Sequence, residues 1–373
     1  MRRVLLLTLA VVLCVPPVRY VMLRATAHEV DRTTPAWRAR EAMIARARVF
    51  VPSPPAIATV DLSRLPDEMT TPDPARVLSC RYVPKPTTGT TSKFDCRLDT
   101  GEIVKVKYGH SRERQGEIAA TRLLAALGFG ADRVTFMERV RCYGCPASPF
   151  QMRKVAEEFL ATRLLDWTLN YARPQDFHAV SVEWKLPGRA IEVDTFEGWD
   201  WVELKLVDSS KGGGTPADLD ALRLMAIFLG HWDNKSTNQR LVCLGDTNGT
   251  PRELCREPLL MLQDLGATFG PTKVDYEAWT ARSIWEDERS CLVSMRSMPY
   301  EGILFAPTVI SEAGRARLAD RLTQLTTDQI RALFAAARFP DPATGAEPAA
   351  DFTPWVRTFE AKVRQIAERR CKE

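Results

Sequence analysis

One stretch, residues 219–270, constrains the fold of this chain more than any other. It opens with an amphipathic helical pattern that runs directly into H-W-D-N-K-S-T-N at residues 231–238. A short hairpin follows, and an apolar strand then ends at Asp264-Leu265-Gly266. The resulting order is H-x-D-x-K-x-x-N followed by D-x-G. Polar side chains this dense after a buried helix need partners, so they predict a functional site.

Composition and charge describe a globular protein. The chain has 373 residues, of which 45% are hydrophobic and 26% charged, enough for one large or two ordinary domains. The formal net charge is only +4, and no dense stripe of lysine and arginine stands out. These features argue against a nucleic-acid partner.

The N-terminus has the pattern of an export signal or a membrane anchor. Arg2 and Arg3 precede an apolar run at residues 4–15 that is too short for a comfortable membrane span. The small residues 25–27 are a candidate cleavage site, but their distance from the apolar run leaves an uncleaved anchor open. We therefore expect residues 1–27 to be a signal peptide or anchor. The protein is then periplasmic, extracellular or anchored in a membrane facing outward.

Export changes the interpretation of the nine cysteines. Eight remain without Cys14, and an even number in an oxidising compartment predicts disulfide bonds. Cys243 and Cys255 flank a turn rich in Gly, Asp and Asn, as partners across a hairpin would. Cys80 and Cys96 flank another turn in the same way.

The remaining cysteines are less informative. Cys142-x-x-Cys145 matches half of a zinc site, but no second C-x-x-C or close histidine pair completes it, so we favour a structural bridge. Pairing of Cys291 with Cys371 is assumed without independent support.

The chain before the hairpin divides into a linker and a β-rich region. Residues 28–76 contain a basic helical pattern followed by several prolines, which predicts a helical and then extended linker. Three short strands separated by turn residues are predicted at residues 77–83, 93–98 and 102–108.

A helix is predicted over residues 114–130, because apolar residues recur there at helical spacing. Glu117 lies one turn before this apolar face and can point toward the strands. The pattern from residue 151 to the end is mainly helical, apart from a strand-like segment at residues 180–184 and the hairpin after residue 238. The sequence therefore predicts an α+β fold with a small antiparallel-sheet lobe over residues 77–150 and a larger, mainly helical lobe over residues 151–373.

The order of these parts resembles the atypical branch of the protein-kinase-like superfamily, which includes HipA-type bacterial kinases, phosphatidylinositol kinases and secreted Golgi kinases. The resemblance covers roughly residues 80–270. T-G-T-T-S-K-F at residues 88–94 resembles the phosphate-covering loop of HipA-type kinases, and I-V-K at 103–105 resembles their lysine strand. K-Y-G at 107–109 instead resembles the phosphatidylinositol kinases. Membership implies a two-lobed protein-kinase-like fold that uses ATP and Mg²⁺ or Mn²⁺.

The resemblance implies catalytic and metal-binding roles in the central stretch. Asp233 would orient or deprotonate the acceptor, and Lys235 would neutralise charge on the transferred group. Asn238 and Asp264 would hold the metal, since oxygen ligands suit a hard cation.

The resemblance also implies a nucleotide site on the small lobe. Its residues are Gly89, Thr90, Lys93, Lys105, Lys107 and Glu117. The first three belong to the covering loop. One of the two strand lysines would contact the phosphates with Glu117 as its acidic partner, and the sequence does not choose between them.

The chain also departs from typical protein kinases. Trp232 stands where they carry arginine, and no A-P-E follows Asp264, so their substrate platform is absent or replaced. Two classes of function are compatible with these features. The first is an exported, ATP- and metal-dependent phosphotransferase whose acceptor, protein or small molecule, is unknown. The alternative is a non-catalytic kinase-like scaffold, or transfer of AMP on the same fold.

Overall fold

The computed structural model describes residues 32–65, 72–86, 88–245, 255–299 and 305–372. The predicted signal peptide or anchor at residues 1–27 lies outside these ranges. By its contacts the chain divides into two compact units, residues 1–39 and 40–373. Within the described ranges, no helix combines the length and the apolar character needed to cross a bilayer.

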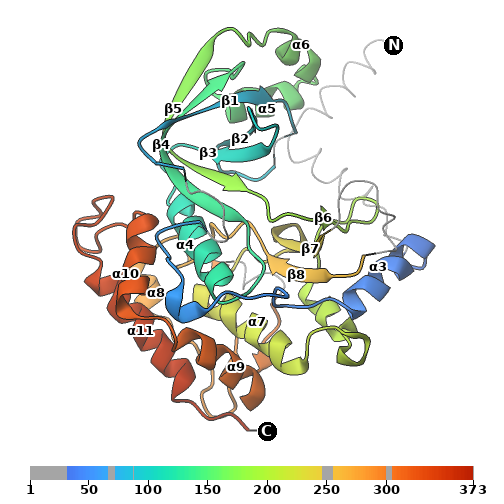
Figure 1. The fold of residues 1–373 in the computed structure, drawn as a ribbon, viewed down its shortest axis with the longest axis vertical. Coiled ribbons are helices and arrows are strands. Elements are labelled where there is room, and N and C mark those ends of the chain that lie inside the picture. The colour runs from blue at the N-terminus through green and yellow to red at the C-terminus, as the bar shows by residue number, and fades with distance from the viewer. Residues whose placement is uncertain (1–31, 66–71, 87, 246–254, 300–304, 373) are drawn as a thin grey trace, which may run out of the picture. The chain divides into compact units, whose positions relative to one another are not determined.

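The small lobe is a barrel of five strands (Figure 1). The strands are β1 (Val77–Val83), β2 (Lys93–Leu98), β3 (Ile103–Lys107), β4 (Arg133–Tyr143) and β5 (Pro174–Trp184). They are joined in the order β1-β2-β3-β5-β4, and every pair is antiparallel except β1 and β4, whose parallel pairing closes the barrel. Alternate side chains of each strand fill the interior, as the two-residue period of a strand requires.

The three predicted strands are confirmed, with β3 one residue shorter at each end. The sequence analysis did not predict β4 and recognised only residues 180–184 of β5. Because β5 pairs with both β3 and β4, the small lobe continues to Trp184, beyond the predicted boundary at residue 150. Two short helices, α5 (Pro149–Glu158) and α6 (Thr162–Trp167), lie between β4 and β5 in the sequence and at the top of the barrel in Figure 1.

The segment predicted as a linker is in large part packed. It contains α3 (Pro35–Ala45) and a short 3-10 turn, η1 (Ile57–Thr59). The backbone of Arg48 forms two hydrogen bonds to the segment 258–260. Its N–H donates to the carbonyl of Pro258 (2.9 Å), and its carbonyl accepts from the N–H of Leu260 (2.8 Å). Several apolar side chains of the segment enter the main hydrophobic core: Ala47, Val49, Ile57 and Leu62. Residues 47–65 are therefore part of the folded unit.

The large lobe is built around α7 (Pro216–Leu229), most of whose residues are buried. Its start is defined by a capping box, in which the hydroxyl of Thr215 accepts from the N–H of Asp218 and the Asp218 carboxylate accepts from the N–H of Thr215. Pro216 occupies the first turn, and Gly230 ends the helix with a left-handed φ of 66°. The predicted amphipathic helix that runs into residues 231–238 is confirmed.

The other elements of the large lobe surround α7. The helices are α8 (Tyr276–Ala281), α9 (Glu312–Leu322), α10 (Thr327–Ala336) and α11 (Thr353–Ala367). The short strands are β6 (Arg189–Ala190), β7 (Gln239–Cys243), β8 (Pro258–Leu262), β9 (Leu292–Val293) and β10 (Thr308–Val309). The predicted hairpin is β7 and β8, which pair antiparallel. The two-lobed α+β architecture predicted from the sequence is thus confirmed.

Four disulfide bonds join the eight cysteines as predicted. The pairs are Cys80–Cys96, Cys142–Cys145, Cys243–Cys255 and Cys291–Cys371. The first two lie together, since Cys96 Sγ is 3.6 Å from Cys142 Sγ. The C-x-x-C is therefore a disulfide rather than half of a zinc site. Disulfides in this number are typical of proteins from oxidising compartments.

Candidate active site

A cleft of about 1030 Å³ lies between the barrel and the large lobe. Strands β1 to β3 and the loop before β2 form one wall, and the segments that follow α7 and β8 form the other. Its size is close to the upper limit for small-molecule sites, about 1000 Å³. Eight predicted site residues line it: Gly89, Thr90, Lys93, Lys105, Asp233, Lys235, Asn238 and Asp264. The other two, Lys107 and Glu117, are buried.

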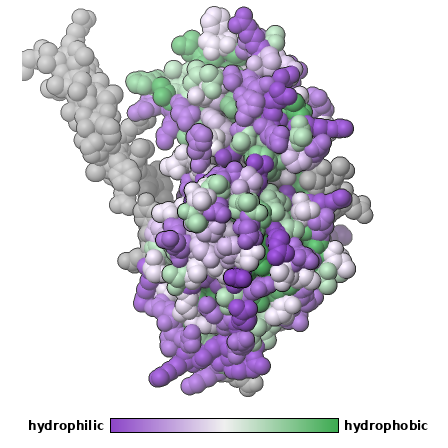
Figure 2. All heavy atoms as spheres, turned by 90° about the vertical axis from the view of Figure 1, so that its left-hand side faces the viewer, coloured by the Kyte–Doolittle hydropathy of each residue, from purple (hydrophilic) through white to green (hydrophobic). Residues whose placement is uncertain are grey.

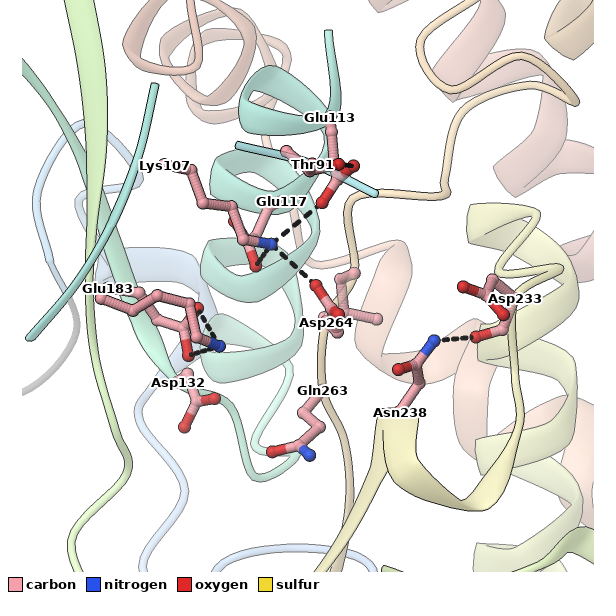
Figure 3. Close-up of polar contacts among 12 residues, drawn as sticks. Thr91, Lys107, Glu113, Glu117, Asp132, Glu183, Asp233, Asn238, Gln263 and Asp264 are labelled. Atoms are coloured by element: carbon pink, nitrogen blue, oxygen red, sulfur yellow. Dashed lines mark hydrogen bonds and ion pairs between the residues drawn. The ribbon is translucent and has the colours of Figure 1, made fainter. Parts of the chain in front are cut away.

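Lys107 is the centre of an ion cluster (Figure 3). Its ammonium lies 2.7 Å from Glu117 Oε1, 2.7 Å from Asp264 Oδ1 and 3.1 Å from Glu113 Oε1. The predicted acidic partner Glu117 therefore contacts Lys107 and not Lys105. The cluster joins three elements that are distant in sequence: strand β3, helix α4 (Glu113–Ala126) and the D-L-G turn after β8.

Two glycines allow α4 to approach the D-L-G turn closely. A Cβ on Gly266 would overlap the side chain of Glu113. A Cβ on Gly116, in the first turns of α4, would lie 2.9 Å from the hydroxyl oxygen of Thr268 and 3.2 Å from the carbonyl oxygen of Gly266. Real Cβ atoms rarely tolerate such contacts, so a larger residue at either position would force the helix and the turn apart. This close crossing places the acidic residues of α4 beside Asp264.

The cluster perturbs the pKa values of its members. Burial acts to lower the pKa of Lys107, but the carboxylates of Asp264, Glu117 and Glu113 outweigh it and hold this pKa well above its ordinary value. The ammonium of Lys107 in turn holds the pKa of Asp264 well below its usual range. Lys107 and Asp264 are therefore both charged at neutral pH.

Glu117 behaves differently from Asp264. It is almost completely buried, and burial raises its pKa to about 7 even though it contacts Lys107. Its second oxygen, Oε2, makes no hydrogen bond to any residue that the structure describes. Glu117 is thus the member of the cluster whose charge changes near neutral pH.

Glu113 and Lys273 extend the cluster to the covering loop, and sequence analysis predicted neither. Glu113 Oε2 accepts a hydrogen bond from the hydroxyl of Thr91 and lies 2.9 Å from Lys273 Nζ. Lys273 also donates to Ser111 Oγ (3.0 Å). Glu113 was overlooked because an acidic residue in the first turn of a helix is ordinary.

The covering loop lies at the edge of the cleft. Gly89 has a φ of 73°, which favours glycine there. Lys93 is half-buried, and this burial lowers the pKa of its ammonium. Thr90 is exposed and lines the cleft.

A second ion network lies beside the first and involves Lys105. Its ammonium lies 3.1 Å from Glu183 of β5, which also contacts Lys185. Lys185 in turn lies 2.9 Å from the buried carboxylate of Asp132. Burial acts to raise the pKa of Glu183, but the surrounding lysines outweigh it and lower this pKa. Lys105 thus supports the barrel wall next to the cleft and has a different acidic partner from Lys107.

The loop after α7 contributes the polar residues of the opposite wall. The Asp233 carboxylate is partly exposed and lies 3.2 Å from the ammonium of Lys235. The side-chain amide of Asn238 donates to the carbonyl of Asp233 (2.7 Å), which ties the two ends of the loop together. Burial lowers the pKa of His231 to about 4, so this histidine is neutral at neutral pH. Trp232 is partly buried and lines the cleft.

No family model and no curated protein matches this chain, whereas solved structures do. The crystal structure of the Helicobacter pylori proinflammatory kinase CtkA is similar to it, with 10% sequence identity and a TM-score of 0.40. The similarity covers 79% of this chain and 96% of that chain.

Proposed function

We propose that this protein is an ATP- and divalent-metal-dependent phosphotransferase of the atypical kinase type. The observation that carries the proposal is the Lys107 cluster. One ammonium is held within 2.7 Å of a helix carboxylate, Glu117, and of the carboxylate after β8, Asp264. Phosphoryl transfer relies on positioned charges more than on covalent chemistry, and this cluster is such an arrangement.

The lining of the cleft includes side chains suited to both parts of a nucleotide. Apolar side chains of both lobes line it, including Val104 on the barrel and Leu241 on β7, and these suit the base. Cationic side chains also line it and suit the phosphates: Lys85, Lys93, Lys105, Lys185, Lys235, Arg240 and Lys273. Acidic side chains line it as well, among them Asp95, Glu192 and Glu197. Lys107 would reach the phosphates once Glu113 and Thr91, the covering-loop residue bonded to it, move aside.

The donor set near the D-L-G turn fits a hard divalent cation. Asp264 offers a carboxylate with one oxygen not used by Lys107, and Asn238 offers an amide oxygen, since its nitrogen is already bonded to Asp233. Oxygen ligands of this kind, with phosphate oxygens and water, suit Mg²⁺ or Mn²⁺. When bound, the ion would neutralise charge on the phosphates.

Asp233 would orient the acceptor or accept its proton, and its partial exposure to the cleft allows this contact. Lys235 beside it would offset charge on the transferred group. Export is part of the proposal, since the four disulfides are typical of an oxidising compartment. The acceptor is a protein or a small molecule.

The nucleotide site is tested by thermal unfolding of the wild type, Asp264→Asn and Asp233→Asn in the presence of ATP, with and without Mg²⁺ or Mn²⁺. A ligand at about 100 times its Kd stabilises a protein by about 2.7 kcal/mol. We expect metal-dependent stabilisation in the wild type and in Asp233→Asn, and its loss in Asp264→Asn. Absence of stabilisation in every combination would contradict the nucleotide site and favour a non-catalytic scaffold.

The transfer itself needs a separate measurement. Mass spectrometry of a reaction with candidate acceptors distinguishes phosphate, a gain of about 80 Da, from AMP, a gain of about 329 Da, by the group transferred. Asp233→Asn should keep nucleotide binding and lose transfer. Equal turnover in the wild type and both variants would contradict the assigned roles.

A further inference from the structure

Exposed apolar side chains are concentrated in one part of the molecule. Among the described residues, ten large apolar side chains are exposed, and seven of them lie between Met152 and Tyr171. The seven are Met152, Val155, Phe159, Leu160, Leu164, Trp167 and Tyr171. Residues 149–173, here named the α5–α6 tip, lie at the end of the barrel that is remote from the helices of the large lobe (Figure 1). Figure 2 shows hydrophobic side chains gathered at this upper end of the molecule.

The inner face of the tip is firmly attached to the barrel. Phe150 and Ala156 are buried, and the backbone N–H of Phe150 donates to the hydroxyl oxygen of Tyr108 (3.1 Å). Arg153 is buried and bonded to Asp166, which joins α5 to α6. The outer apolar side chains are therefore displayed by a fixed support, and little conformational freedom is lost when they bind.

The outer side chains project to an unusual degree. Leu160 is 88% exposed, Trp167 85% and Phe159 74%. Leu160 also has a left-handed φ of 54°, a conformation in which a glycine would be less strained. A bulky apolar side chain is thus present at the corner between the helices where neither burial nor backbone geometry favours it.

The charges of the tip are mainly positive where they face water. Lys154, Arg163 and Arg173 are exposed, whereas Glu158 is the one exposed acid in residues 149–173. The other acids, Glu157 and Asp166, are engaged by the buried guanidinium of Arg153. Trp, Phe and Leu flanked by Lys and Arg are the composition of segments that lie in the interface of an anionic membrane.

From these features we propose that the α5–α6 tip docks on the surface of a membrane that contains anionic lipids. The apolar side chains enter the boundary between head groups and acyl chains, and the exposed cations contact the head groups. The tip protrudes rather than forming a groove, so a fluid interface fits it better than the rigid surface of a folded partner. Pro149, the first residue of α5, also lines the cleft, so docking would hold the cleft near the membrane surface.

The first test places an environment-sensitive dye on the tip of the full chain. Leu160→Cys is labelled in a Cys14→Ser background, because the other eight cysteines form disulfides. The control label is at Asp328→Cys, a residue on α10 whose side chain is 93% exposed. Vesicles of phosphatidylcholine with phosphatidylserine should shift the emission to the blue at residue 160 and not at residue 328.

The outcomes of this test are distinct. Binding through the apolar run at residues 4–15 would sediment the protein with vesicles without changing the dye at residue 160, and would overturn the proposal. A blue shift that grows with protein concentration in the absence of vesicles would show that a second copy covers this face, and would also overturn it. A shift with anionic vesicles that weakens in phosphatidylcholine alone or at high salt is the expected result.

The second test separates docking from folding. Leu160→Gly removes the apolar side chain and relieves the left-handed backbone, so its Tm should be equal to or above that of the wild type. The triple variant, in which Phe159→Ser and Trp167→Ser are added, is measured without a dye. Its partition coefficient onto anionic vesicles should fall by roughly tenfold or more, because apolar burial drives interfacial binding. Val309→Ser, at an exposed position of the large lobe, is the matched control and should partition as the wild type. Unchanged partitioning of the tip variant would overturn the proposal.

Discussion

The ammonium of Lys107 and the carboxylate of Glu117 are 2.7 Å apart, although Lys107 ends strand β3 and Glu117 lies within helix α4. Neither side chain has appreciable contact with water. A buried pair of this kind must stay together, because separating it leaves an uncompensated charge in the protein interior. The pair therefore fixes α4 against the barrel at the edge of the cleft.

Lys107→Met should destabilise the protein far more than Lys105→Met. The first variant leaves three carboxylates without their shared ammonium, at a cost of roughly 3 to 5 kcal/mol. The second leaves Glu183 in contact with Lys185, so the expected loss is only about 1 kcal/mol. Chemical denaturation measures both values. Only Lys107→Met should also abolish stabilisation by ATP, and retention of that stabilisation would exclude Lys107 from the nucleotide site.

Gly266→Ala should disturb the cleft through a steric effect. The new methyl group would overlap the side chain of Glu113, and overpacking of this kind costs about 1 to 3 kcal/mol. Gly214→Ala is the matched control, since a Cβ there meets its neighbours at ordinary contact distances of 3.4 to 3.7 Å. Adding Glu113→Ala to Gly266→Ala should restore part of the lost Tm, because the clash involves the atoms beyond Cβ. Equal Tm values for the two glycine variants would contradict this account.

The stability of the protein should depend on pH through Glu117. Its pKa is about 7 in the folded protein and 4.5 for an ordinary glutamate in water, so the folded state holds this proton more tightly than the unfolded state. The stability contributed by the group is therefore fully present below about pH 4.5 and is lost as the pH rises through about 7. Glu117→Gln removes this dependence. We expect the free energy of unfolding of the wild type, relative to that of the variant, to fall between pH 4.5 and 7. A constant difference over this range would contradict the assignment.

Loss of the Cys291–Cys371 disulfide should be more costly than loss of Cys142–Cys145. The first bond joins cysteines with a sequence separation of 80, and the second joins cysteines with a separation of 3. Because a longer closed loop restricts the unfolded chain more, replacement of both cysteines by serine should cost about 4 kcal/mol in the first case and less than about 2 kcal/mol in the second. Thermal unfolding of the two double variants gives the comparison, and the reverse order would contradict the loop-closure explanation.

Local patterns in the chain were sufficient to predict many of these features. Strands β1 to β3, helix α7 and the β7–β8 hairpin follow from alternating or helical apolar spacing, which depends on near neighbours in the sequence. The disulfide between Cys243 and Cys255 follows from two cysteines on either side of one turn, because a hairpin brings such residues together. Asp233, Asn238 and Asp264 were predicted as site residues because polar side chains stand directly after apolar elements that are buried, and the structure places all three at the cleft.

Local sequence patterns did not predict the contacts between segments that are distant in the sequence. Lys105 and Lys107 point to the same side of β3, and the choice between them depends on which one lies over α4. That position is set by the close approach of Gly116 and Gly266, which are far apart in the sequence. The pairing of β5 with β3 and β4, which extends the small lobe past residue 150, likewise depends on closure of the barrel. The position of the acidic cluster around one buried ammonium is therefore a property of the packed fold, because burial and long-range approach exist only once the two lobes have formed.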